Sequence, residues 1–108
     1  MSDILLKLYN IIKDRQQNPA ENSYTCYLFN QGLDKILKKC GEECSEVIIA
    51  AKNGKQEQTV YEISDLLYHL TVLMVYQNIP FEAVFEELSN RSAKLGNLKQ
   101  FHQVDKNT

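Results

Sequence analysis

Apolar residues recur every three or four positions through most of this chain, the spacing that places side chains on one side of an α-helix. The pattern is clearest from residue 33 to residue 52, and Asn53-Gly54 then stops the predicted helix. The apolar stripe of this helix consists of Leu33, Ile36, Leu37, Cys40, Cys44, Val47, Ile48 and Ala51. A second long helix is expected over residues 56–77, with an inward face formed by Ile63, Leu66, Leu67, Leu70 and Met74.

Shorter helices are expected on both sides of this long pair. One begins near Ser2 and fades in the polar stretch 14–21, and another runs over residues 80–95 with Phe81, Val84, Phe85 and Leu88 inward. Residues 23–29 are aromatic and hydroxyl-rich, and Gly32 permits a break before the next helix. No segment has the pattern of a β-strand. Because the loop between the two long helices is short, the sequence predicts an all-α bundle around a central antiparallel helix hairpin.

The length of the chain sets limits on its organisation. A chain of 108 residues is enough for one domain with a modest core, predicted here as residues 1–96, followed by a polar tail over residues 97–108. Association with a second copy adds core to so small a bundle. Ile49, Val72 and Val75 fall outside the expected core of the single chain, so we expect a homodimer to complete the fold.

Composition excludes several classes of function. A formal net charge of -2 argues against a nucleic-acid-binding protein, which usually presents a basic face. No apolar run approaches the roughly 20 residues that span a bilayer, and the N-terminus lacks the features of a signal peptide. Cys26, Cys40 and Cys44 have no metal-site spacing and are interpreted as small hydrophobes in a reducing compartment. The sequence therefore favours a cytoplasmic protein without a membrane partner.

Acidic residues form two pairs on the long helices. Glu43 and Glu46 are three positions apart, as are Glu62 and Asp65, so each pair shares one side of its helix. The hairpin can therefore bring four carboxylates together beside the core. Such groups repel one another unless a cation neutralises them, and oxygen ligands favour Mg2+, with Mn2+ as the alternative. A single pair of this kind is common on solvated helix faces; two pairs on adjacent helices favour a metal site.

Three other polar residues lie close to these acids along the chain. Lys38 and Lys39 are one turn upstream of the first pair and can meet a phosphate, although solvated lysines are as common. His69 lies one turn beyond Asp65 and can orient a ligand or contact substrate, but half-buried structural histidines are more frequent.

These residues also match a known signature. The runs Gly41-Glu42-Glu43-x-x-Glu46 and Glu62-x-x-Asp65 resemble the signature of the all-α nucleoside triphosphate pyrophosphohydrolases. Within that superfamily, residues 4–91 resemble the phosphoribosyl-ATP pyrophosphohydrolase family of histidine biosynthesis. The segments specific to that branch are Ser23-Tyr24-Thr25, Gly32-x-x-Lys35-Ile36-x-Lys38-Lys39, Glu46 to Lys52, Asp65 to Leu70, and Glu87-Leu88-x-x-Arg91.

The resemblance implies a homodimeric, nucleotide-binding hydrolase that cleaves phosphoribosyl-ATP into phosphoribosyl-AMP and pyrophosphate. It assigns metal binding to Glu43, Glu46, Glu62 and Asp65, and it leaves Glu42 or Glu43 to take a proton from water. The residues then expected to contact substrate are Tyr24, Thr25, Lys38, Lys39, His69 and Arg91. Two alternatives remain: a house-cleaning enzyme that acts on non-standard nucleotides with the same acids, and a helical dimer without catalytic activity.

Overall fold

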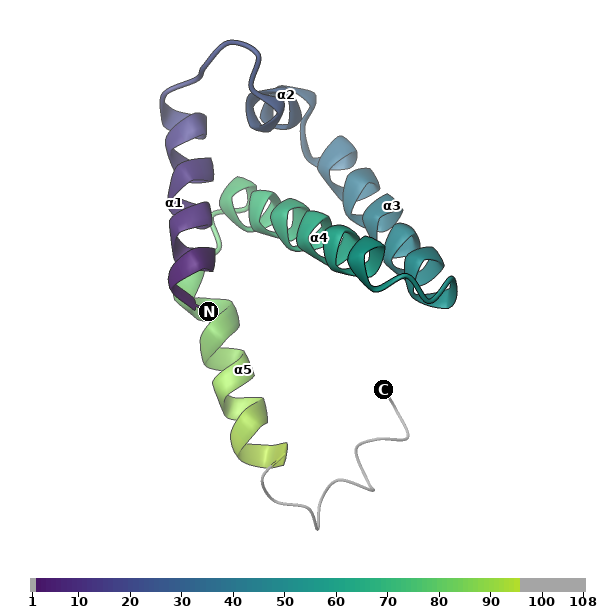
Figure 1. Cartoon of the computed structure of the whole chain (residues 1–108). Coiled ribbons are helices and arrows are strands. Elements are labelled where there is room, and N and C mark those ends of the chain that lie inside the picture. Colours follow the sequence, from purple (N-terminus) through teal and green to yellow (C-terminus); the bar gives the residue numbers. More distant parts are fainter. Residues whose placement is uncertain (1, 96–108) are drawn as a thin grey trace.

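The computed structural model describes residues 2–95, and within that range the chain consists of five α-helices without a strand (Figure 1). The helices are α1 (Ser2–Gln17), α2 (Tyr24–Gln31), α3 (Leu33–Lys52), α4 (Gln56–Tyr76) and α5 (Phe81–Leu95). The prediction of an all-α chain with a long central hairpin is confirmed. The predicted boundary at residue 96 and the tail over residues 97–108 lie outside the described residues.

Helices α3 and α4 pack against each other as a hairpin whose loop end extends away from α1 (Figure 1). Helix α1 crosses the C-terminal end of α4, α2 lies at the start of α3, and α5 projects away from the other helices. The buried core lies where α1, α2 and the hairpin meet. It consists of Tyr9, Ile12, Leu28, Ile36, Val72, Val75 and Phe81. No helix among residues 2–95 is long and apolar enough to cross a membrane.

Local interactions determine where α2 begins and ends. The Ser23 hydroxyl accepts a hydrogen bond from the Cys26 amide at 3.1 Å, which caps the N-terminus of α2. Gly32 separates α2 from α3 and has a φ of +92°, a conformation that L side chains rarely adopt. The hydroxyl-rich segment after residue 22 is therefore a short helix that turns directly into the hairpin.

The inward faces of the hairpin differ from the predicted ones. On α3, Ile36, Glu43 and Ala50 are buried, whereas Leu37 and Ile48 are 45% and 63% exposed. On α4, the buried residues are His69, Thr71, Val72 and Val75, whereas Ile63, Leu67 and Leu70 are exposed. Both helices are apolar on two sides, and spacing alone does not tell which side faces the rest of the same chain.

The predicted placement of Val72 and Val75 was wrong, because both are fully buried inside the single chain. Other apolar side chains of the hairpin and of α5 are exposed instead, and we call these residues together the open face. Its residues are Leu37, Ile48, Ile49, Ile63, Leu67 and Leu70 on the hairpin and Val84 and Leu88 on α5. The prediction for Ile49 is confirmed, since it is 55% exposed, and the homodimer stays a prediction that now depends on the open face.

Candidate active site

Polar and apolar residues form successive layers along the hairpin. Ile36 and Val72 are both fully buried and belong to the same core cluster. One turn nearer the hairpin loop come Lys39 on α3 and His69 on α4, and after another turn come Glu43 and Asp65. Because α3 and α4 are antiparallel, each of these steps moves in the same direction on both helices. The acids therefore lie at the point where the buried core gives way to solvent.

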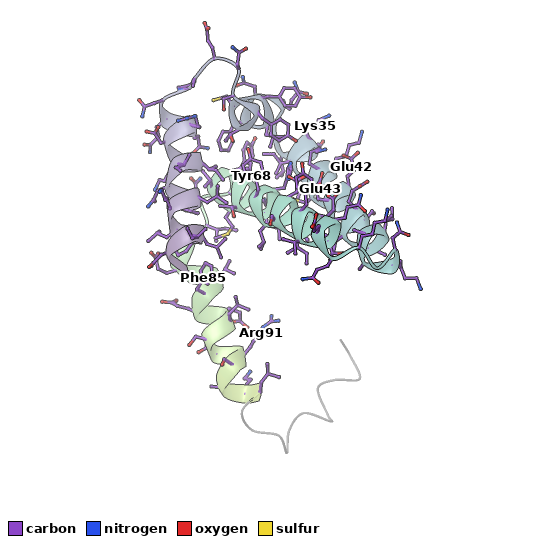
Figure 2. The ribbon with its side chains drawn as sticks, in the orientation of Figure 1. Lys35, Glu42, Glu43, Tyr68, Phe85 and Arg91 are labelled. Atoms are coloured by element: carbon purple, nitrogen blue, oxygen red, sulfur yellow. The ribbon has the colours of Figure 1, made fainter. Side chains whose placement is uncertain are left out.

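Glu43 and Asp65 form the centre of the site. Their carboxylate oxygens lie within 4.8 Å of each other and of a nitrogen of His69. Glu43 is only 6% exposed although it is an acid, and the Nζ atom of Lys39 lies 3.5 Å from its Oε1. Figure 2 shows Glu43 and its neighbour Glu42 on α3 beside α4. Lys39 also pairs with Glu42, at 3.3 Å, so one ammonium group serves both glutamates.

The electrostatics of this centre favour a cation. Burial raises the pKa of the Glu43 carboxyl, and its hydrogen bond with Asp65 and the charge of Asp65 raise it further. Lys39 and His69 lower that pKa but do not reverse the direction. Two carboxylates that share a site in this way need a proton or a metal ion between them. A hard divalent cation fits the oxygen donors that both helices supply.

A second network joins α2 to α4 beside the acids. The Tyr24 hydroxyl lies 3.0 Å from Nε2 of His69, and the Thr25 hydroxyl forms a hydrogen bond with the Tyr68 hydroxyl. Nδ1 of His69 lies 2.8 Å from the backbone carbonyl oxygen of Asp65. His69 is 2% exposed, whereas the Tyr24 side chain is 45% exposed. Burial raises the pKa values of both Tyr24 and Tyr68, so both phenols keep their protons.

The other predicted site residues lie at different distances from this centre. Glu46 is exposed and Glu62 is half-buried, and neither belongs to the group formed by Glu43, Asp65 and His69. Lys38 is exposed on α3. Arg91 forms an ion pair with Glu87 on α5, away from Glu43 within the chain (Figure 2). The roles of these residues remain predictions.

Two aromatic residues belong to the site without having been assigned a role from the sequence. Tyr68 is half-buried and forms a hydrogen bond with Thr25. The Tyr27 ring stacks on the Tyr24 ring, with centroids 5.9 Å apart. The ammonium group of Lys35 lies 5.9 Å from the centroid of the Tyr27 ring. Position 68 is three residues after Asp65, so its place on the same side of α4 could have been read from the spacing. The position of Tyr27 depends on the course of α2, which spacing did not predict.

Comparison with known proteins gives a consistent result. The family model described as phosphoribosyl-ATP pyrophosphohydrolase matches residues 5–92. A phosphoribosyl-ATP pyrophosphatase of Clostridium acetobutylicum is 54% identical over 99 residues, which are 92% of this chain and 90% of that protein. The protein of the same name from Listeria monocytogenes is 53% identical over 102 residues, 94% of this chain and 98% of the relative. The histidine biosynthesis bifunctional protein HisIE of Caldanaerobacter subterraneus is 55% identical over 92 residues, 85% of this chain and 45% of that longer protein.

Proposed function

We infer the function of this chain from its family, because the chain belongs to the phosphoribosyl-ATP pyrophosphohydrolase family. It hydrolyses phosphoribosyl-ATP to phosphoribosyl-AMP and pyrophosphate, the second step of histidine biosynthesis. The observation that carries this assignment is identity of about half the residues with the named relatives over nearly the whole chain. The paired acids of α3 and α4 are the chemistry that such a reaction needs.

The proposed metal site has an inner and an outer pair of acids. Glu43 and Asp65 form the inner pair. Glu46 lies one turn towards the hairpin loop from Glu43, and Glu62 lies one turn towards the same loop from Asp65, so the outer pair occupies the next layer. We propose that these four carboxylates hold Mg2+, with Mn2+ as the alternative. The metal, when bound, withdraws charge from the substrate phosphates and lowers the pKa of a water molecule.

Other residues of the site have roles that follow from their charge and exposure. Glu42 is exposed and pairs with Lys39, so its carboxylate can take the proton of the attacking water when Lys39 contacts a substrate phosphate. Burial lowers the pKa of the Lys39 ammonium, but its hydrogen bond to Glu42 and the neighbouring charges raise it overall, so Lys39 stays charged for a phosphate contact. The exposed ring of Tyr24 faces solvent beside the acids and offers a surface for the base or ribose. Thr25, Lys38 and Arg91 remain proposed substrate contacts.

The proposed partner is a second copy of this chain. The open face places isoleucine and leucine side chains of α3 and α4 in solvent, and α5 projects from the bundle with Leu88 51% exposed. A second copy would cover this surface and give α5 a neighbour to pack against. We also propose a cytoplasmic location, since Cys26, Cys40 and Cys44 are all free thiols.

Substrate profiling tests the proposed function. The purified protein is incubated with Mg2+ and either phosphoribosyl-ATP or the non-standard nucleotides ITP and dUTP, and pyrophosphate release is measured. We expect kcat/KM for phosphoribosyl-ATP to exceed the other values by at least about a hundredfold, since a site built for one substrate's polar groups discriminates strongly. Equal or greater activity on ITP or dUTP would support the house-cleaning alternative instead.

A further inference from the structure

His69 lies close enough to Glu43 and Asp65 to complete a site of two carboxylates and one imidazole. One nitrogen of its ring and one oxygen of each acid lie within 4.8 Å of one another. Such a set of ligands would shift the preference of the site towards transition metals, because imidazole is a softer ligand than carboxylate. The hydrogen bonds of the imidazole decide whether His69 has a lone pair to offer.

Both ring nitrogens of His69 already have partners. Nδ1 lies 2.8 Å from the carbonyl oxygen of Asp65 and 3.5 Å from its Oδ1. Both of these oxygens are acceptors only, so Nδ1 must carry a proton. Nε2 lies 3.0 Å from the hydroxyl of Tyr24, which donates to it when the ring is neutral. In the protonated ring, neither nitrogen has a lone pair. In either state, no lone pair of His69 points to the acids.

The same contacts connect the first turn of α2 to α4. Tyr24 and Thr25 are the first two residues of α2, and they bond to His69 and Tyr68, two consecutive residues of α4. The Tyr24 ring also meets the His69 ring edge to face, with centroids 5.7 Å apart. We call the Tyr24–His69 and Thr25–Tyr68 hydrogen bonds together the α2 clasp. They join a short helix to the hairpin in the layer next to Glu43 and Asp65.

We propose that His69 is a positioning residue that holds the start of α2 beside the acids and is not itself a ligand of the metal. This inference deepens the proposed function, on which it rests for the identity of the site. It makes His69 responsible for where the exposed ring of Tyr24 lies, and hence for substrate binding rather than for metal affinity. Its buried position, at 2% exposure, agrees with a residue that does not touch substrate.

Nuclear magnetic resonance of the 15N-labelled wild-type chain gives the first test. The shifts of the two ring nitrogens distinguish a protonated nitrogen from one with a lone pair. We expect Nδ1 of His69 to carry a proton, because it faces the Asp65 carbonyl oxygen, and the pair of shifts to stay the same when Mg2+ saturates the site. A neutral ring protonated on Nε2, or a large shift of either nitrogen on adding Mg2+, would overturn the proposal. This readout needs no substrate, so it does not depend on the proposed reaction.

Variants give the second test. Tyr24→Phe and His69→Ala each remove the Tyr24–His69 hydrogen bond of the clasp. His69→Gln keeps an acceptor near the Nε2 position. The control Tyr61→Phe makes the same chemical change as Tyr24→Phe at a tyrosine that is 67% exposed on α4. Loss of the partly buried Tyr24–His69 hydrogen bond should speed amide exchange in α2 about five- to tenfold in the first two variants. His69→Gln should restore part of the protection, and Tyr61→Phe should match the wild type.

Metal affinity separates the two roles of His69 in the same variants. Mn2+ binding, followed by electron paramagnetic resonance, should weaken much less in His69→Gln than in Glu43→Gln, which removes one of the proposed carboxylate ligands. Equal weakening in the two variants would overturn the proposal, as would unchanged exchange in α2 of Tyr24→Phe. Absence of pyrophosphate release with these metal and exchange results intact would refute the proposed function and leave the clasp in place.

Discussion

Replacing Asp65 by asparagine should stabilise the metal-free protein while it weakens metal binding. The substitution keeps the size of the side chain and removes one of two negative charges whose oxygens lie at most 4.8 Å apart. At that distance two unit charges repel by about 0.9 kcal/mol in bulk water and by about 3.5 kcal/mol at the effective dielectric constant near a protein surface. The Asp65 side chain is 33% exposed, and Lys39 partly neutralises Glu43. We therefore expect the lower part of this range, about 1–2 kcal/mol.

Thermal melting measures this effect. For a domain of this size, about 1–2 kcal/mol corresponds to an increase in Tm of about 5–10 °C. Wild type and Asp65→Asn are compared at one protein concentration, first with a chelator and then with Mg2+, and Glu86→Gln on α5 serves as a matched loss of an exposed charge. Mg2+ at a hundred times its Kd should add about 2.7 kcal/mol to the wild type and much less to Asp65→Asn. A lower Tm for Asp65→Asn than for the wild type in chelator would contradict this prediction. An equal gain in Tm from Mg2+ in the two proteins would also contradict it.

Three further predictions concern the same site and the open face. The raised pKa of Glu43 means that the folded metal-free protein binds a proton more tightly than the unfolded chain does. That contribution to stability is complete below the ordinary glutamate pKa of 4.5 and is lost as pH rises through the raised pKa of Glu43. The gain in Tm from Mg2+ should therefore grow with pH over that window. A gain in Tm that does not depend on pH would contradict this prediction. Ile48→Lys should shift the sedimentation of the wild type from dimer towards monomer at micromolar concentration, because Ile48 is 63% exposed on the open face; a wild-type monomer, or an unaltered dimer in the variant, would contradict the proposed interface. Glu62→Gln should lower kcat by several orders of magnitude with unchanged circular dichroism, because a hard cation loses a charged ligand; near wild-type turnover would remove Glu62 from the metal site.

The sequence predicted the bounds of the helices better than it predicted which side of each helix faces the core. The bounds of α3 agree with the prediction of about residues 33–52, because a long periodic stripe ends at Asn53-Gly54. The bounds of α4 and α5 differ from their predictions by one residue each. Helix α2 could not be assigned, since eight residues contain too few turns for a period to show. The inward faces of the hairpin were misjudged because Leu67 and Leu70 have the spacing of a core but lie on the open face.

The candidate site was predicted in part for a related reason. Glu43 and Asp65 were expected to converge, because a short loop makes the hairpin antiparallel and the i, i+3 spacing defines a side of each helix. The burial of Glu43 on the inner face was not expected, since acids were placed on the flank of the stripe. The bonds of Tyr24 to His69 and of Thr25 to Tyr68 join residues more than 40 positions apart. Helical spacing says nothing about pairs that distant, so only the fold reveals them.

We propose that the acids of α3 and α4 hold the metal on which hydrolysis of phosphoribosyl-ATP depends. The most direct measurement is the rate of pyrophosphate release from phosphoribosyl-ATP at saturating Mg2+ by the wild type, Glu43→Gln and the exposed-charge control Glu86→Gln. We expect the wild type and Glu86→Gln to release pyrophosphate at similar rates. Folded Glu43→Gln should be slower by at least about a thousandfold, since metal binding and water activation fail together. Wild-type turnover by folded Glu43→Gln would contradict it.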